Sequence, residues 1–414
     1  MPFSGGEALQ VPRRILLGVC GGIAAYKVVQ LVRLLQGQGH TVRVIGTPSS
    51  REFVGPATWE GLTGLPFATS MHESGSMMGH IHWPDQADLY IIAPATAHTL
   101  QALAQGVSDS LVTTAYLAAK CPVMVVPAMN VNMWQHAATQ ANVELLRRRG
   151  TSVVPTGRGD LACGWQGEGR MLEPQDILAY AERQLAMPRL RGLRVTVTAG
   201  ATREFLDPVR YISNPSSGKM GLELAYCAWT MGAEVTVIAA QTARPAYHGS
   251  ALEGDGWRAV WVDSAEQMRA AVLDSGLVFD WYISAAAVSD YTADRQSQKQ
   301  KKTDGPQTID LSRTVDILAQ VGARRGDGQL IVGFAAETQS VVEYARGKLQ
   351  AKNLDAIVYN DVNPASGVGF ASESNAGGIL MRDGDHVQLP LLSKRRFAQA
   401  ILMELARRFR GAGA

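Results

Sequence analysis

The feature that most constrains this chain is a pattern that occurs twice: a continuous apolar run, a glycine turn, and then a helical pattern. The first copy runs from Ile15–Cys20 through Gly21 and Gly22, and the second from Leu193–Thr198 through Gly200. Apolar runs bounded by turn residues are typical of strands buried on both faces of a parallel sheet. The sequence therefore predicts an α/β protein with two doubly wound, Rossmann-like domains, the first flavodoxin-like.

Further strand and helix patterns alternate along both halves of the 414 residues. Additional strands are predicted at 42–45, 89–93 and 123–126 in the first half and at 234–239, 281–285, 330–334 and 356–359 in the second. The segment MPRLRG at 187–192 separates the halves, so we expect domains at 1–188 and 193–414. Two segments lack apolar periodicity: the glycine-rich stretch 155–170, predicted to be a lid or a disordered loop, and the polar stretch 292–306, predicted to be a mobile loop.

Composition limits the function classes. Hydrophobic residues make up 46% and charged residues 18%, which excludes global disorder, and the net charge of +2 argues against a nucleic-acid coat. No apolar run is long enough to span a bilayer. The four cysteines are scattered without a C-x-x-C pair, which argues against a disulfide scaffold or a cysteine zinc site and favours reduced thiols in a cytoplasm.

The first glycine turn, G-V-C-G-G-I-A-A at 18–25, lies where a helix start can bind a phosphate. It is not G-x-G-x-x-G, so a mononucleotide such as FMN and a tight turn without ligand both remain open. Residues 47–50, which carry hydroxyls, follow the second strand, and the small residues 93–96 follow the strand at 89–93, at the same sheet edge. A simple helix N-cap would also explain residues 47–50. The candidate cofactor-binding residues are Gly21, Gly22, Ile23, Thr47, Ser49, Ala93, Pro94, Ala95 and Thr96.

Three residues of the first half carry candidate chemistry, each with a structural alternative. His80, in G-H-I-H, can act as a base or be an ordinary surface or core histidine, and H-x-H alone is thin evidence for zinc. Asn130 can orient a carboxylate or amide, or stabilise its own loop. Cys163 can donate a proton or thiolate from the glycine-rich segment, or be a small loop residue.

In the second half, S-N-P-S-S-G-K at 213–219 leads directly into a helix and is a plausible phosphate cradle, although it is not a P-loop. Lys299, Lys301 and Lys302 can close over a polyphosphate or form a solvated loop. Asp290 follows a predicted strand and can meet a ribose, a base or a metal-bound phosphate.

Taken together, these segments resemble the bacterial bifunctional phosphopantothenoylcysteine decarboxylase/phosphopantothenate–cysteine ligase family of coenzyme A synthesis. The resemblance covers residues from about 13 to 410, and its most specific segments are PAMNVNMW at 127–134, ACGWQGEGRM at 162–171, TAGATREFLDPVRYISNPSSGKMG at 198–221, AAAVSDY at 285–291 and VGFAAET at 332–338.

The resemblance implies an FMN-binding N-terminal decarboxylase domain and a CTP-dependent C-terminal ligase domain that uses Mg²⁺. It makes His80 the active-site histidine, Asn130 the binder of the substrate carboxylate, and Cys163 the cysteine of the reductive step. In the ligase it places Asn214 near an acyl-cytidylate, Lys299 in the K-x-K-K loop, and Asp290 at the CTP and metal site. The remaining CTP or substrate contacts it implies are Arg210, Ser217, Gly218, Lys219, Ala286, Lys301, Phe334, Lys348 and Lys352.

By the same resemblance, the ligase joins 4′-phosphopantothenate to cysteine through an acyl-cytidylate, and the decarboxylase converts the product to 4′-phosphopantetheine. The family also implies a homo-oligomer, with a dodecamer expected, and neither a nucleic-acid nor a membrane partner. Three positions depart from the family pattern: His98 and Gln101 near the expected flavin site, and Val315 in place of a proline.

Overall fold

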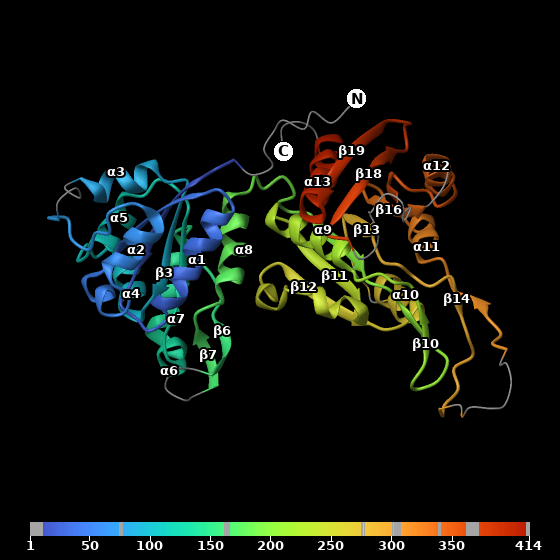
Figure 1. Ribbon diagram of the computed structural model, residues 1–414, viewed down its shortest axis with the longest axis horizontal. Coiled ribbons are helices and arrows are strands. Elements are labelled where there is room, and N and C mark those ends of the chain that lie inside the picture. Colours follow the sequence, from blue (N-terminus) through green and yellow to red (C-terminus); the bar gives the residue numbers. More distant parts are fainter. Residues whose placement is uncertain are drawn as a thin grey trace. The chain divides into compact units, whose positions relative to one another are not determined.

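The computed structural model describes residues 11–73, 78–160, 166–274, 276, 278–299, 301, 308–337, 341–361 and 372–410. The chain divides into two compact units, one of residues 10–186 and one that begins at Met187 (Figure 1). No helix within the described residues is long and apolar enough to cross a membrane.

The N-terminal unit is built on a five-stranded parallel sheet in the order β2-β1-β3-β4-β5. Its strands are β1 (Arg14–Val19), β2 (Thr41–Gly46), β3 (Leu89–Ala95), β4 (Val123–Pro127) and β5 (Ser152–Val153). Almost every residue of β1 and β3 is buried, because helices cover both faces. The continuous apolar runs in the sequence follow directly from this double burial.

Helices α4 (Ala97–Gln105), α5 (Leu111–Ala118) and α7 (Ala137–Arg148) cover one face of this sheet, where Leu103, Val112 and Leu146 pack with Tyr90 and Ile92. Helix α3 (Gly79–Gln86) packs beside α5. Helix α1 (Ala25–Gly37) lies between α2 (Pro56–Thr63) and α8 (Pro174–Leu185), and a short 3₁₀ turn, η1 (Pro48–Glu52), follows β2.

The glycine-rich stretch 155–170 contains a two-stranded antiparallel hairpin of β6 (Gly157–Asp160) and β7 (Gln166–Arg170). The disordered alternative was therefore wrong for these two strands, and the lid stays a prediction. Met129 N donates a hydrogen bond to Gly169 O (2.9 Å), which ties the hairpin to the start of α6 (Val131–Gln135). Gly169 has φ +118°, and a Cβ there would lie 2.6 Å from Met129 O. The glycines that obscure a strand pattern thus permit this close backbone contact.

The C-terminal unit is built on an eight-stranded sheet in the order β12-β11-β8-β13-β16-β17-β18-β19. The first six positions are parallel: β12 (Trp257–Val262), β11 (Glu234–Ala240), β8 (Arg194–Ala199), β13 (Trp281–Ser284), β16 (Leu330–Glu337) and β17 (Ala356–Asp361). Strands β18 (Ser374–Met381) and β19 (His386–Ser393) extend the sheet antiparallel.

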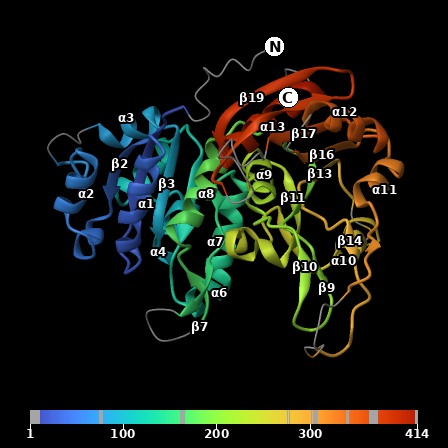
Figure 2. The same cartoon turned by 45° about the vertical axis from the view of Figure 1, so that its right-hand side comes forward.

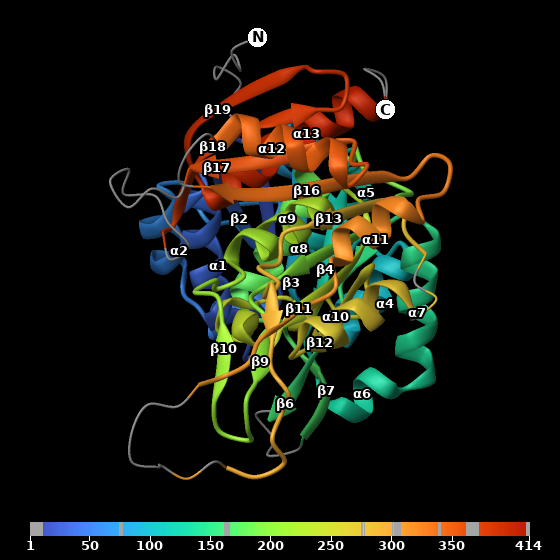
Figure 3. The ribbon, with the colours of Figure 1, turned by 90° about the vertical axis from the view of Figure 1, so that its right-hand side faces the viewer.

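Two helices, α9 (Lys219–Thr230) and α13 (Lys394–Phe409), pack together against β8, β11, β18 and β19. Helices α10 (Ala265–Leu273), α11 (Ile317–Ala323) and α12 (Val341–Ala351) cover the other face, where Met268, Ile317 and Leu349 pack against Tyr282 and Ile331 (Figure 3). Helices on both faces of a mostly parallel sheet confirm the predicted doubly wound fold of both units.

Besides the β6–β7 hairpin, several strands have no counterpart in the sequence prediction. They are β5, β12, the eight-residue strands β18 and β19, and two hairpins: β9 (Arg203–Phe205) with β10 (Tyr211–Ser213), labelled in Figure 2, and β14 (Tyr291–Thr292) with β15 (Ser312–Arg313). Two 3₁₀ turns, η2 (Gln241–Ala246) and η3 (Ser250–Leu252), also occur. Strand β19, at the edge of the sheet, has one buried residue, Leu389, among eight, so it lacks the fully buried apolar run of a central strand.

Candidate functional site

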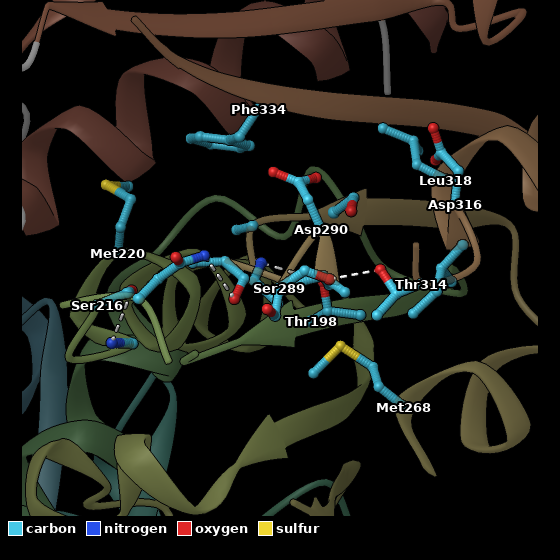
Figure 4. Close-up of a pocket in the computed structure, with 18 of the residues that line it drawn as sticks. Thr198, Ser216, Met220, Met268, Ser289, Asp290, Thr314, Asp316, Leu318 and Phe334 are labelled. Atoms are coloured by element: carbon cyan, nitrogen blue, oxygen red, sulfur yellow. Dashed lines mark hydrogen bonds between the residues drawn. The ribbon is translucent and has the colours of Figure 1, made fainter. Parts of the chain in front are cut away.

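The clearest candidate site is a cavity of about 680 Å³ in the C-terminal unit, at the carboxyl ends of β8 and β13 (Figure 4). The loop after β13, the start of α9 and the start of α11 contribute to its walls. Ligands of open α/β sheets bind at this edge, because the loops after neighbouring parallel strands converge there.

The floor of the cavity is the loop after β13, residues 285–290, whose backbone is held by several hydrogen bonds. Ala287 N donates to Gly200 O (2.8 Å), Ser289 N donates to Thr202 Oγ1 (2.9 Å), and Thr314 Oγ1 donates to Ser289 O (2.5 Å). These bonds fix the backbone that leads to Asp290, and Figure 4 shows the Asp290 carboxylate pointing into the cavity on the side of Phe334.

One end of the cavity is the loop that opens helix α9. Gly218 is the N-cap residue, has φ +72°, and makes no side-chain cap. A Cβ on Gly218 would lie 2.5 Å from the Ala243 Cβ, so only glycine fits this turn. Ser217 Oγ is buried and has no hydrogen-bond partner among the described residues, while Asn214 Nδ2 donates to Ala287 O (3.5 Å). Backbone amides at an uncapped helix start and an unused hydroxyl favour an anion here.

The other end of the cavity is formed by α11 and α12. The Asp316 carboxylate accepts a hydrogen bond from Ala319 N (3.0 Å) and forms an ion pair with the Lys352 ammonium (2.8 Å). Burial opposes ionisation of Asp316, but the hydrogen bonds from Lys352 and from Ala319 N outweigh it and lower the pKa of this carboxyl. Figure 4 shows Asp316 and Leu318 well separated from Ser216 and Met220, so the cavity is elongated.

Nine of the residues singled out in the second half of the sequence line this cavity. They are Asn214, Ser217, Gly218, Lys219, Ala286, Asp290, Phe334, Lys348 and Lys352. Lys299 and Lys301 are exposed and, among the residues described, are not part of the lining. Arg210 is also outside the lining, and its guanidinium pairs with the fully buried carboxylate of Asp207 (2.6 Å).

The cavity also contains polar residues that the sequence did not single out, among them Thr198, Asp316, Asn375 and Lys394. Thr198 Oγ1 accepts a hydrogen bond from Ala286 N (3.2 Å) and so supports the floor. Asp316 has a recognisable helix-cap signal, because it directly precedes an apolar helical stretch. Asn375 and Lys394 have no such signal, since strands β18 and β19, which were not predicted, bring them to the site.

In the N-terminal unit the predicted cofactor residues converge at the carboxyl ends of β2, β1 and β3. Gly21 N donates to Thr47 Oγ1 (3.2 Å), and the hydroxyls of Thr47 and Ser49 are 3.2 Å apart. A Cβ on Gly22 would lie 3.7 Å from Thr96 Cγ2, so the loop after β3 reaches the same place. No side chain caps α1. The strand order 2-1-3-4-5 places its switch point here, and this set of amides and hydroxyls fits a mononucleotide phosphate.

The three candidate catalytic residues of this unit differ in their structural surroundings. His80 lies on α3, and its Nδ1 is buried without a hydrogen-bond partner among the described residues. Asn130 is the N-cap of α6 and accepts a hydrogen bond from Asn132 N (2.8 Å). Cys163 lies outside the described residues, between the two strands of the β6–β7 hairpin.

The departure at position 98 has a structural partner: His98 Nε2 lies 3.1 Å from an Asp109 carboxylate oxygen, and both side chains are exposed. Within the described residues, no group of three or more His, Cys, Asp or Glu side chains is arranged to hold a metal ion. A metal at Asp290 would therefore need ligands from a bound molecule as well.

Comparison with known proteins follows the same two-part division. The Flavoprotein family model matches residues 7–186, and the model described as DNA/pantothenate metabolism flavoprotein C-terminal domain matches residues 190–409. The Coenzyme A biosynthesis bifunctional protein CoaBC of Bacillus subtilis (strain 168) is 42% identical over 400 residues, which cover 95% of this chain and 97% of the relative. The protein of the same name from Mycobacterium tuberculosis (strain H37Rv) is 42% identical over 409 residues, covering 95% and 96%.

Solved structures match each unit separately. The C-terminal domain of a Coenzyme A biosynthesis bifunctional protein CoaBC is 37% identical, covers 54% of this chain and 98% of its own, and gives a TM-score of 0.44. The FMN-dependent cysteine decarboxylase SpaF is 32% identical, covers 42% and 97%, and gives a TM-score of 0.37.

Proposed function

The chain belongs to the family of bifunctional coenzyme A biosynthesis proteins, which have a decarboxylase and a ligase activity, and from this membership we propose where each reaction takes place. The family resemblance predicted from the sequence is thereby confirmed. We assign the ligase reaction to the cavity of the C-terminal unit and the decarboxylase reaction to the flavoprotein unit, with CTP, FMN and Mg²⁺ as the finer parts of the proposal.

In the ligase reaction, a carboxylate oxygen of 4′-phosphopantothenate attacks the α-phosphorus of CTP, and pyrophosphate leaves. The amine of cysteine then attacks the acyl carbon of the acyl-cytidylate, an amide bond forms, and CMP leaves. Both steps need the reacting groups to be held in line and negative charge to be stabilised. An elongated cavity with cationic side chains at both ends suits this task, because two anionic substrates must meet inside it.

Each end of the cavity receives one part of CTP in this proposal. The phosphates lie at the start of α9, where the backbone amides after Gly218, the Ser217 hydroxyl and the Lys219 ammonium are suited to anions. The nucleoside lies toward the end formed by α11 and α12, which contributes Lys348 and Lys352, and Phe334 is a further contact implied by the family. Asn214 and Ala286, which both line the cavity, contact the acyl-cytidylate in this proposal.

Asp290 is suited to Mg²⁺, since this ion is commonly bound by one or two carboxylates together with substrate phosphates. When bound, the ion would offset charge on the phosphates. Asp290 projects into the cavity between the two ends, which is consistent with that role (Figure 4). Lys299, Lys301 and Arg210 lie outside the lining, so we propose that the two lysines approach the polyphosphate only when substrate is bound, and leave Arg210 as a contact implied by the family.

In the flavoprotein unit, Gly21, Gly22, Thr47, Ser49 and Thr96 would hold the FMN phosphate with backbone amides and hydroxyls, and Ile23 with the 93–95 segment would face the rest of the cofactor. FMN supplies the two-electron chemistry that loss of CO₂ from a cysteinyl group requires. We propose His80 as the active-site base, Asn130 as the group that orients the substrate carboxylate, and Cys163 as the proton donor of the reductive step.

The observation that carries the ligase proposal is the convergence of nine predicted residues on one cavity. The test is pyrophosphate release: we expect it from CTP only when 4′-phosphopantothenate is present, and more slowly from ATP. Release without 4′-phosphopantothenate, or none at all, would contradict the assignment. For the flavoprotein unit, purified protein should be yellow and release FMN on denaturation.

The assembly is proposed from the family as a homo-oligomer, with a dodecamer expected, and the cytoplasmic location also stays a prediction. Light scattering coupled to size-exclusion chromatography measures the assembly directly, and a monomer would contradict it.

A further inference from the structure

Two lysines stand in the same unusual position at one end of the ligase cavity. Lys219 is the first residue of α9 and Lys394 the first residue of α13, and both line the cavity. A cation at a helix N-terminus is repelled by the positive end of the helix dipole, so the ammonium groups of both lysines stand in an unfavourable position. Lys394 is also buried, with 6% of its surface exposed. Burial first and the charge of Lys219 second lower the pKa of Lys394.

Several contacts place the two helix starts next to each other. Asn375 Nδ2 contacts Met220 Sδ (3.1 Å), which joins β18 to the first turn of α9. Lys394 N donates to Glu373 O (2.9 Å), which joins the residue before β18 to the start of α13. Because α9 and α13 also pack along their length, two helix N-termini converge on this end of the cavity.

The Glu373 carboxylate interacts with both of these lysines. It forms an ion pair and hydrogen bond with the Lys219 ammonium, and it interacts electrostatically with Lys394. Its side chain is 79% exposed, so it approaches the lysines from the solvent side and is not built into the core. An exposed ion pair of this kind contributes little to stability and is readily exchanged for another anion.

One further group at this end lacks an internal partner. Ser217 Oγ is buried, has no hydrogen-bond partner among the described residues, and belongs to a residue that lines the same cavity. A buried hydroxyl without a partner is costly, and a bound ligand would satisfy it.

From this arrangement we propose that Lys219 and Lys394 together form the subsite for the outer phosphates of the nucleotide, which leave as pyrophosphate, and that Glu373 is an internal counterion which those phosphates displace. The inference rests on the proposed ligase function and deepens it. The outer phosphates are the most highly charged part of the substrates, and two ammonium groups with two helix starts form the most strongly anion-binding end of the cavity. At the opposite end, the Lys352 charge is already balanced by Asp316.

The test uses the full-length protein and inorganic pyrophosphate as the probe, with binding measured by calorimetry at fixed MgCl₂. Glu373→Gln removes the competing charge from an exposed site, so we expect pyrophosphate to bind roughly two- to fivefold more tightly and the KM for CTP to fall in parallel. Lys394→Gln removes a charged hydrogen-bond donor, so we expect binding to weaken by roughly tenfold or more.

The matched control is Glu223→Gln. Glu223 pairs with Arg395, the residue next to Lys394 on α13, but neither Glu223 nor Arg395 is among the cavity-lining residues. This variant should leave pyrophosphate binding and the KM for CTP unchanged. A melting curve of each variant checks that the fold is retained, and the exposed Glu373→Gln change tests the proposal even if Lys394→Gln unfolds.

The outcomes separate this inference from the proposed function. Unchanged or weaker pyrophosphate binding in Glu373→Gln overturns the proposed role of Glu373 as a counterion. A Lys394→Gln variant that alters the KM for 4′-phosphopantothenate and not pyrophosphate binding assigns the subsite to the other substrate, and so overturns the inference alone. Wild-type protein that neither binds nor turns over CTP overturns the ligase proposal and the inference with it.

Discussion

Both units have a glycine turn between the first strand and its helix, but the polar groups around this turn differ between the two units. In the N-terminal unit the turn after β1 is surrounded by hydroxyls and backbone amides from Thr47, Ser49 and Thr96, and none of the nine predicted cofactor residues carries a charge. In the C-terminal unit the corresponding region opens into a cavity lined by Lys219, Asp290, Asp316, Lys348, Lys352 and Lys394.

This difference indicates two kinds of ligand. A single phosphate that stays bound is well served by fixed neutral donors, whereas a polyphosphate that is cleaved and released needs mobile charges whose partners can be exchanged. The comparison predicts that damage to one unit leaves the reaction of the other intact.

The largest difference between the two activities should come from Cys163→Ser. Loss of the proton donor should reduce 4′-phosphopantetheine formation by roughly 10³-fold, because general acid catalysis makes contributions of that order. Liquid chromatography of the products from supplied 4′-phosphopantothenoylcysteine measures this. CO₂ should still be lost once per flavin, which leaves an oxidised intermediate and reduced flavin. Normal 4′-phosphopantetheine output would contradict the role, and ligation by the same preparation serves as the control.

The converse change is Asp290→Asn in the C-terminal cavity. This change removes the proposed protein ligand of Mg²⁺, and with it part of the charge that offsets the phosphates, so ligation should slow roughly 100-fold. Pyrophosphate release from CTP measures it. Decarboxylation of supplied 4′-phosphopantothenoylcysteine should be unchanged, and normal ligation would show that Asp290 does not serve the phosphates.

A third pair of variants compares the two glycine turns directly. A Cβ on Gly21 would lie 2.3 Å from Ser49 Oγ, so Gly21→Ala should displace that hydroxyl and weaken flavin retention without affecting ligation. Gly218→Ala should lower the stability of the C-terminal unit by at least about 1–2 kcal/mol, since alanine is strained at φ +72° and its Cβ would also lie 2.5 Å from the Ala243 Cβ. Flavin absorbance and thermal melting separate the two. Equal loss of both activities in either variant would break the comparison.

The smallest expected effect concerns the opposite edge of the C-terminal sheet, where Asp280 accepts hydrogen bonds from Arg194 (2.7 Å and 2.8 Å). These bonds, opposed by partial burial, lower the pKa of Asp280 below 3.8. The pair therefore stabilises the fold above pH 3.8, and its contribution disappears as the pH falls through the lowered pKa.

We accordingly expect Asp280→Asn to cost about 1 kcal/mol or less at neutral pH and nothing in strong acid. Denaturant unfolding at several pH values measures it. Because Asp280 is remote from the cavity lining, the KM for CTP should not change, and a shift in KM would show that the two edges of the sheet are coupled.

The sequence alone determined the fold class, the family and most of the cavity. Fully buried parallel strands such as β3 must be apolar along their whole length, and their loops must converge at one edge, so the segment 213–219 and Asp290 could be proposed from the pattern. The family resemblance implied the separate roles of Asn214 and Ser217 and added Phe334. The predictions for His80, Asn130 and Cys163 remain to be tested.

The tertiary structure decided what lies far apart in the chain but shares the cavity. Strand β18 has polar, alanine and glycine residues over its first five positions, and the edge strand β19 is mostly exposed. Neither these strands nor Asn375 and Lys394, which they bring to the cavity, were predicted from periodicity. The hairpin β6–β7 was hidden for a related reason, since its glycines pair through backbone atoms that leave no side-chain pattern. Local sequence specifies buried elements because burial constrains side chains. The meeting of Lys219, Glu373 and Lys394 instead depends on an ion pair between Lys219 and Glu373, which are 154 positions apart, and on a backbone hydrogen bond that joins Glu373 to Lys394 across the ends of β18 and β19.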